Sequence, residues 1–168
     1  MNELISYRKF KFNGSYNREK EDFTYTAFFD YDFSNDKETT SFFRSDFSRS
    51  NFISCTFNGN AFGRADFINV IMKNVEFEEV NFGSCLFKNS LIEKVHFQNN
   101  KYHGVAIQYS YFKKCIFRNE KIITNMYNCE FEQCTFINCK FEKSSLDHNS
   151  FIDCELIKLI FRNVLLKI

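Results

Sequence analysis

A large apolar residue recurs every five positions through most of this sequence, and this period constrains the fold more than any other feature. From Phe42 the series runs in steps of five to Phe117 and continues through Ile122 and Tyr127. It then slips by one residue and resumes at Phe131. Fixed internal periods are typical of repeat architectures, in which stacked units share one continuous core. We therefore expect a repeat fold, with the slip lying somewhere in Ile122–Tyr127.

The members of this series are expected to form the structural core. The chain contains 24 Phe and no Pro, so one bulky ring supplies most of the interior. The aromatic members that we assign to the core are Phe47, Phe52, Phe57, Phe62, Phe67, Phe77, Phe82, Phe87, Phe97, Phe112, Phe117, Phe131, Phe136, Phe141 and Phe151.

The position two residues before each apolar centre is usually small, and every one of the seven cysteines falls there. Residues two apart in an extended chain point to the same side. Inward positions that alternate by two and three fit neither a straight strand nor a helix of period 3.6. The pattern predicts a short extended piece and a corner in every repeat, so the chain must coil. The inward small residues include Cys55, Cys85, Cys115, Cys129, Cys134, Cys139 and Cys154.

This pattern resembles the pentapeptide-repeat family, whose repeats carry Leu or Phe at the centre, a small residue two before it and often Asp or Asn between them. Asp46, Asn51, Asp66 and Asn81 fit that last preference. The resemblance implies an all-β fold, a right-handed, quadrilateral parallel β-helix with four repeats in each coil. We expect one domain over 1–168, with an irregular N-terminal coil and loop (1–41), a regular β-helix (42–154) and a C-terminal cap or dimerisation segment (155–168).

Stacking by twenty residues makes specific predictions about neighbours. Lys73, Glu93 and Lys113 should form a ladder of alternating charge, which parallel strands favour. After the slip of one residue, Cys115, Cys134 and Cys154 should share a face.

The two ends of the chain carry the candidate interaction residues. The polar segment SNDKETTS interrupts the series between Phe33 and Phe42. It is either an ordinary surface corner or a recognition loop, with Asn35, Asp36, Lys37 and Glu38 as the candidates. The C-terminal segment fits either a last coil or a short amphipathic helix. In both cases it leaves surplus apolar surface, which is typical of interaction sites. We predict a homodimer through this end, and the candidate dimer surface is Ile157, Ile160, Leu165 and Ile168.

Enzyme chemistry is not expected. The cysteines are spaced by five rather than in a zinc pattern. His96, His103 and His148 take outward positions, and the five glycines form no phosphate loop. We predict no catalytic residue, no metal and no cofactor. Asn60, Asn100 and Asn149 occupy inward positions, where their side chains should bond the backbone.

We predict a non-enzymatic binding or scaffold protein that presents a rigid β-helical surface to a protein partner. An alternative is a DNA mimic that binds DNA gyrase and protects it from fluoroquinolones. The repeats and the stretch FTYTAFFDYDFSN resemble the quinolone-resistance branch of the family, although the net charge of +1 departs from an acidic mimic. A rod that assembles end to end is a further alternative. Near-equal numbers of basic and acidic residues, 22 and 21, argue against direct nucleic-acid binding. No segment predicts a membrane span or a secretion signal, so a cytoplasmic protein is expected.

Overall fold

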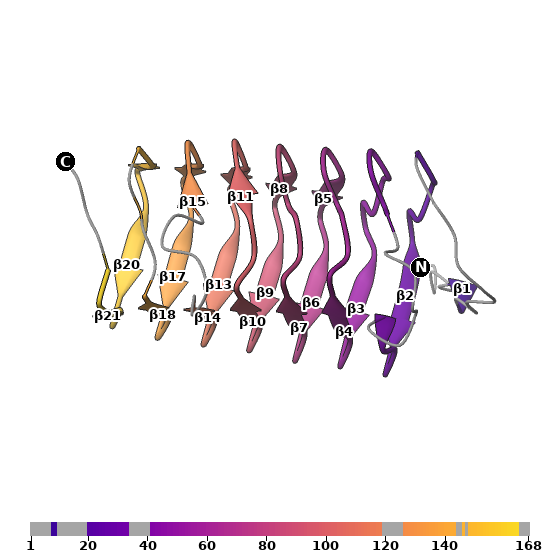
Figure 1. The fold of residues 1–168 in the computed structure, drawn as a ribbon, viewed down its shortest axis with the longest axis horizontal. Coiled ribbons are helices and arrows are strands. Elements are labelled where there is room, and N and C mark those ends of the chain that lie inside the picture. Colours follow the sequence, from indigo (N-terminus) through magenta and orange to yellow (C-terminus); the bar gives the residue numbers. More distant parts are fainter. Residues whose placement is uncertain are drawn as a thin grey trace, which may run out of the picture.

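The chain winds into a four-sided β-helix with its coils stacked along one axis. This computed structural model describes residues 8–9, 20–33, 41–118, 126–143, 146 and 148–164. In Figure 1 the coils follow one another along the long axis in sequence order, from indigo to yellow. Neighbouring strands in every sheet are parallel and come from successive coils. The expected all-β repeat fold is confirmed.

Four walls enclose the core, and we number them in the order in which the chain passes through them from Phe42. Wall 1 contains β11 (Tyr102–His103) and β15 (Met126–Tyr127), with bridges at Ser41, Ala61 and Asn81. Wall 2 contains β5 (Asp66–Ile68), β8 (Leu86–Lys88), β12 (Ala106–Gln108), β16 (Glu130–Glu132) and β19 (Ser150–Ile152). Wall 3 contains β1 (Arg8–Lys9), β2 (Thr26–Phe29), β3 (Asn51–Ile53), β6 (Ile71–Lys73), β9 (Leu91–Glu93), β13 (Tyr111–Lys113), β17 (Thr135–Ile137) and β20 (Glu155–Ile157). Wall 4 contains β4 (Thr56–Asn58), β7 (Glu76–Glu78), β10 (His96–Gln98), β14 (Ile116–Arg118), β18 (Lys140–Glu142) and β21 (Ile160–Arg162).

The corners between walls share a positive φ at one position of the repeat. In each described repeat, the residue two after the apolar centre has a positive φ, as in Arg64 (59°), Asn69 (58°) and Asn74 (53°). This left-handed conformation costs a non-glycine residue about 1 kcal/mol. Because the chain turns there every five residues, the same side of each short strand always faces inward. Burial of the large centre that precedes each corner offsets the cost of the turn.

Phenylalanine rings stack on one another inside the coils. Along wall 2 the ring of Phe47 lies 4.8 Å from Phe23 at 8° and 5.2 Å from Phe67 at 6°. Rings of neighbouring walls meet edge to face, as Phe42 and Phe47 do at 72°. Both arrangements are favoured by the ring quadrupole. The predicted core residues are buried, with one correction: Phe151 is 36% exposed because it belongs to the last described coil.

The inward small residues fill the space beside the rings, as predicted. Six of the seven cysteines are buried, and Cys154 is half-buried in the last coil. Their polar atoms bond the backbone of the preceding coil: Cys85 Sγ donates to the Phe62 carbonyl at 2.9 Å, and Ser90 Oγ donates to the Phe67 carbonyl at 3.0 Å. These bonds give the carbonyl groups at the corners a side-chain donor; the Phe62 carbonyl also accepts from the Ala65 N–H at 2.8 Å.

The inward asparagines behave partly as predicted. Asn100 Oδ1 accepts from the Val80 N–H at 2.8 Å while its Nδ2 donates to the Phe77 carbonyl. Asn149 Oδ1 accepts from the Cys129 N–H at 2.9 Å. Asn60 Oδ1 is buried without a partner. That oxygen is an unfavourable feature of the core, because a buried unpaired acceptor costs about 1–3 kcal/mol.

Two interruptions change the vertical spacing from 20 to 24 residues. Val70 bonds Ser90 at a separation of 20, whereas Thr26 bonds Ser50 and Gln108 bonds Glu132 at a separation of 24. The second interruption places Met126 opposite Tyr102. The series therefore re-enters wall 1 at Met126, and the expectation of a centre at Tyr127 was wrong. Ile122 lies outside the described residues.

Both interruptions occupy the same corner of the β-helix. The chain leaves wall 4 after Phe33 and reaches wall 1 at Ser41, and it leaves wall 4 again after Arg118 and reaches wall 1 at Met126. Each interruption adds four residues at this one corner, so the other three corners of the coil keep their regular length. The slip of one residue that the sequence shows is this insertion. A coil of four repeats with four extra residues and a run of five repeats with one residue missing both contain 24 residues.

The C-terminal segment is a coil as far as it is described. Its strands β20 and β21 extend walls 3 and 4 through Arg162, so the alternative of a helix was wrong for these residues. Residues 165–168 lie outside the described part of the chain. The five-residue period therefore predicted the structure of this segment correctly. The spacing of its aliphatic residues by three and four does not correspond to a helix.

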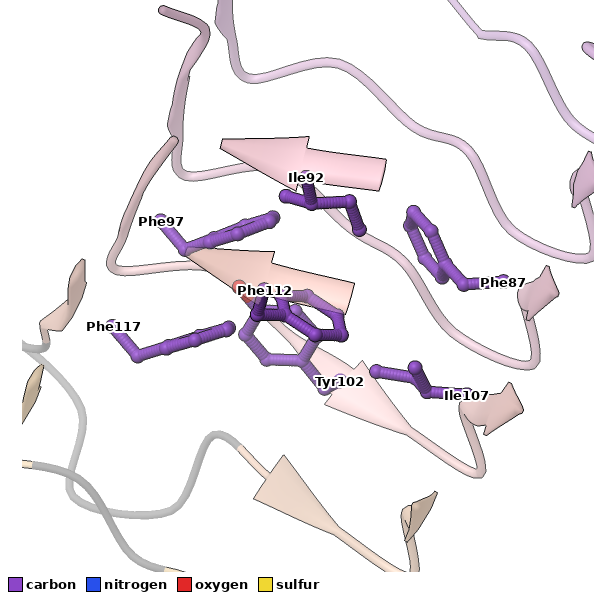
Figure 2. A pocket seen from close by; sticks show the side chains of 7 residues that line it. All are labelled: Phe87, Ile92, Phe97, Tyr102, Ile107, Phe112 and Phe117. Atoms are coloured by element: carbon purple, nitrogen blue, oxygen red, sulfur yellow. The ribbon is translucent and has the colours of Figure 1, made fainter. Parts of the chain in front are cut away.

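A small cavity of about 10 Å³ lies in the middle of the core (Figure 2). It forms where Ile92 and Ile107 occupy central positions in place of aromatic residues. Ile92 stacks on Phe112, and Ile107 stacks on Phe87. A space of this size is close to the lower limit for one water molecule, and an apolar lining would keep it dry. It is lined by Phe87, Ile92, Phe97, Tyr102, Ile107, Phe112 and Phe117.

Removal of a stacked ring should destabilise the protein far more than removal of an exposed one. We expect Phe47→Ala to lower the free energy of unfolding by about 3–5 kcal/mol, because the cavity cannot collapse between two rigid coils. Phe29 is 54% exposed, so Phe29→Ala should cost less than about 1 kcal/mol. Guanidinium unfolding followed by circular dichroism measures both, and equal losses would contradict a core built on stacking.

Candidate functional site

The outer surface consists of residue columns that repeat once per coil. Each short strand points one residue inward and its two neighbours outward, so the outward residues of successive coils stand one above another. The predicted ladder of Lys73, Glu93 and Lys113 on wall 3 is confirmed by the strand register. Lys113 Nζ lies 3.6 Å from Glu93 Oε1. The same wall carries an apolar column of Ile71, Leu91 and Tyr111.

Wall 2 begins with an acidic column. Asp22, Asp46 and Asp66 pair in register through successive coils. Burial and, secondarily, the neighbouring Asp46 carboxylate raise the pKa of Asp66. The column then changes to Leu86 and Ala106.

The acidic character of wall 2 returns with Glu130 and Glu132 on β16. Lys88 on β8 lies between the two acidic stretches. Among the described residues, wall 2 therefore carries acidic groups near both ends but no continuous acidic face.

Wall 1 combines the two glycines Gly63 and Gly83 with positive charge at its edge. Gly63 lies against the side chain of Phe43, where a Cβ would meet the ring at 3.0 Å. The guanidinium carbons of Arg44 and Arg64 lie 5.1 and 5.7 Å from the centre of the Phe43 ring. Cations over an aromatic face at these distances are attracted by its quadrupole. One ring thus holds two arginines of successive coils near each other.

The C-terminal end exposes residues that occupy the core elsewhere. Leu156 and Phe161 hold central positions of the last coil but are 49% and 48% exposed. Of the candidate dimer residues, Ile160 is 40% exposed and Ile157 is half-buried, and both point outward from walls 4 and 3. Leu165 and Ile168 lie outside the described residues.

The candidate recognition loop also falls outside the described part. Asn35, Asp36, Lys37 and Glu38 lie there, between Phe33 on wall 4 and Ser41 on wall 1. The described flanks thus place both ends of this segment at the corner between walls 4 and 1.

The cysteines pair differently from the sequence expectation. Because the register there is 24 residues, Cys115 stacks on Cys139 in wall 4 and Cys134 stacks on Cys154 in wall 3. The prediction that Cys115, Cys134 and Cys154 share a face is confirmed for Cys134 and Cys154 and was wrong for Cys115, since it assumed a spacing of 19 across the slip. A hydrogen bond with Cys139 and burial both raise the pKa of Cys115.

The side chains that could carry chemistry come together at most in pairs that could not hold a metal ion, as far as the chain is described. His96, His103 and His148 are exposed at outward positions, as predicted. His96 Nδ1 lies 4.0 Å from Glu76 Oε1 on the neighbouring coil of wall 4. Within the part of the chain that the structure describes, no group of three His, Cys, Asp or Glu side chains could hold a metal ion. The same residues include no helix long and apolar enough to cross a membrane.

Wall 1 is the surface that sequence reasoning missed. Its signal was present in the outward positions of the repeats centred on Phe42, Phe62, Phe82 and Tyr102, which contain no Asp or Glu. That signal becomes visible once the repeats are sorted by wall, which requires the lengths of the coils.

Comparison with known proteins places the sequence among repeat proteins. One family model, described as a pentapeptide repeat region, matches residues 45–122, and a second, described as pentapeptide repeats in eight copies, matches residues 124–167. No curated protein matches the chain.

Several solved structures are similar. A trypsin-treated variant of QnrB1, a plasmid-mediated fluoroquinolone resistance protein, has 19% identity and a TM-score of 0.44, over 93% of this chain and 69% of that one. HetL, involved in heterocyst differentiation regulation in Nostoc sp. strain PCC 7120, has 8% identity and a TM-score of 0.35, over 92% and 90%. Rfr23 from Cyanothece 51142 has 9% identity and a TM-score of 0.23, over 89% and 90%.

Thiol reactivity should separate Cys154 from the other cysteines. Burial raises the pKa of Cys85 to about 12 and the pKa of Cys55 to about 11. Because the thiolate is the reactive form, buried thiols should react slowly at pH 8. We expect one rapid thiol in a titration with Ellman's reagent and seven after unfolding. Cys154→Ser should abolish the rapid phase, whereas several rapid thiols would show that the inward positions are open.

Proposed function

Because the chain belongs to the pentapeptide-repeat family, we propose that it is a rigid, non-enzymatic module that binds a protein partner through its walls. The observation that carries this proposal is the combination of a filled core with outward columns at a fixed pitch. The cavity at Ile92 and Ile107 holds about 10 Å³, far below the few hundred Å³ of a metabolite pocket. Recognition would therefore take place on the outer surface.

A rigid surface is suited to this role for an energetic reason. Binding costs free energy whenever side chains or loops must become ordered, and a preorganised surface reduces that cost. The short strands fix the backbone beneath every outward residue through hydrogen bonds such as Arg64 N to Gly83 O, 2.8 Å. Each wall can thus present charges without rearranging.

The charges of the walls favour this general role over a DNA mimic. A mimic of the duplex would need a continuous acidic face, which would occupy a DNA-binding surface electrostatically. On wall 2 the column that begins with Asp22, Asp46 and Asp66 continues with Leu86 and Ala106. We therefore make binding of a protein partner the proposal and do not extend it to gyrase.

We also propose that two copies associate through the C-terminal end. Leu156, Phe161 and Phe151 form an apolar end that a second coil would cover in the middle of the rod. Ile160 enlarges it on the outside of wall 4. A second copy can cover this end by a symmetric contact, which is the commonest arrangement of homodimers.

Charge reversal of one wall at a time tests binding by the walls. Four variants change outward pairs: Arg44→Glu with Arg64→Glu, Asp46→Lys with Asp66→Lys, Lys73→Glu with Lys113→Glu, and Glu76→Lys with Glu78→Lys. We expect quantitative affinity capture from cells that produce the chain to enrich a protein that one variant loses and the other three keep. Enrichment that no variant reduces would contradict the proposal. Equal circular dichroism spectra of all four confirm that they fold.

Substitution of outward residues in the last coil tests the dimer. Ile157→Asp with Ile160→Asp should shift the mass measured by light scattering during size-exclusion chromatography from two chains to one, because two buried carboxylates would oppose the contact. Lys158→Asp with Arg162→Asp changes neighbouring exposed residues and should leave the dimer largely intact. A wild-type protein that elutes as a monomer at every concentration would remove the dimer from the proposal.

A further inference from the structure

We propose that wall 1 is a docking surface for an acidic segment of another protein. This inference rests on the proposed function, because it names which wall binds and what chemistry it recognises. The surface consists of the outward residues that the chain places on wall 1 and its edge toward wall 2 at residues 41–44, 61–64, 81–84 and 101–104.

The first observation is the sign of the charge. These four short segments contain Arg44, Arg64 and Lys101 and no carboxylate. Each of the other walls carries acidic residues at outward positions, such as Asp46 on wall 2, Glu93 on wall 3 and Glu76 on wall 4. Over these four coils, the described part of the chain thus presents a surface without carboxylates on one side.

The second observation is that the two arginines are held in place without being neutralised. Both guanidinium groups lie over the ring of Phe43. Neither forms an ion pair with any described residue. In the acidic column of the adjacent wall 2, Asp46 bonds the backbone instead of an arginine: its Oδ1 accepts from the Ser48 N–H at 2.8 Å.

The neighbouring aspartate supports the same conclusion. The pKa of Asp66 is raised, by burial first and by Asp46 second. A guanidinium paired with that carboxylate would lower its pKa instead. Arg44 and Arg64 thus keep their hydrogen-bond donors available to a partner.

The third observation is the low relief of the wall. Between the Phe43 ring and the exposed side chain of His103, the wall carries the small residues Ala61, Gly63, Gly83 and Ser84, so an extended chain could approach the backbone closely there. The backbone itself is already paired between coils, as in Phe42 N to Ala61 O at 2.7 Å and Phe62 N to Asn81 O at 2.8 Å. Recognition would therefore depend on side chains and not on addition of a strand.

The chemistry of the donors favours carboxylates on a protein over a nucleic acid. Arg44 and Arg64 stand one coil apart, a backbone spacing of about 4.8 Å, and each guanidinium can bind a carboxylate through two parallel hydrogen bonds. A nucleic-acid site commonly neutralises about 6–10 phosphates, and wall 1 offers three cations for that purpose. A segment with two or three closely spaced Asp or Glu residues matches the number and spacing of the cations.

A model peptide tests this proposal. The probe is a fluorescein-labelled peptide of alternating glutamate and serine, measured by fluorescence anisotropy at low salt. We expect Arg44→Gln with Arg64→Gln to weaken its binding about tenfold, equivalent to about 1.4 kcal/mol. Lys94→Gln with Lys114→Gln removes the same charge from another edge and should change the affinity less than about twofold. Arg44→Lys with Arg64→Lys should give an intermediate loss, because lysine keeps the charge without the paired donors.

Any one of the following results would overturn the inference. The first is an equal loss of peptide affinity in the variant Arg44→Gln with Arg64→Gln and in the variant Lys94→Gln with Lys114→Gln. Absence of peptide binding to the wild-type protein would have the same meaning. The second is tighter binding of a duplex oligonucleotide, which would make the wall a nucleic-acid surface. The third is self-association at low salt that the arginine variants abolish, which would make a second copy the occupant. If charge reversal on another wall removes a captured protein, the proposed function stands and this inference fails.

Discussion

The stacking of aromatic rings at the spacing of β-strands is the interaction on which the structure depends. Strands in a sheet lie about 4.8 Å apart, and the ring centres of Phe23, Phe47 and Phe67 are separated by 4.8 and 5.2 Å. A ring therefore fills the height of one coil, and a second ring can lie flat against it in the next. This match explains why one residue type fills so many central positions. Where Ile92 and Ile107 replace rings, the stack leaves a cavity.

The same constraint makes the surface regular. Since every coil must rise by one strand spacing, outward residues cannot drift relative to those above and below them. Lys73, Glu93 and Lys113 form a ladder for this reason, and so do the aspartates of wall 2. The interior is nearly uniform along the rod, whereas the columns differ in charge and size from wall to wall. The outward columns, and not the interior, must therefore distinguish one partner from another.

The interruptions preserve this regularity by sharing one corner. A four-residue insertion inside a strand would shift the inward residues relative to the coil below and would expose rings. At the corner between walls 4 and 1, the extra residues leave the strands on both sides in register, as Phe97, Phe117 and Phe141 show by their parallel stacking. Both insertions adjoin wall 1, one near each end of its described length. The proposed docking surface thus lies between the two insertions.

The sequence by itself determined which residues face inward and that the chain must coil, because a period of five with a small residue two before each centre is compatible with no straight element. It also predicted the buried cysteines, the outward histidines and the charge ladder of wall 3. It did not determine how many residues separate vertical neighbours at the interruptions, since an insertion of four and a slip of one produce the same spacing. That ambiguity assigned Tyr127 instead of Met126 to the core series and grouped Cys115 with Cys134 instead of Cys139. Only the tertiary structure decided which columns stand together on a wall, because stacking depends on the length of a whole coil and not on any local pattern.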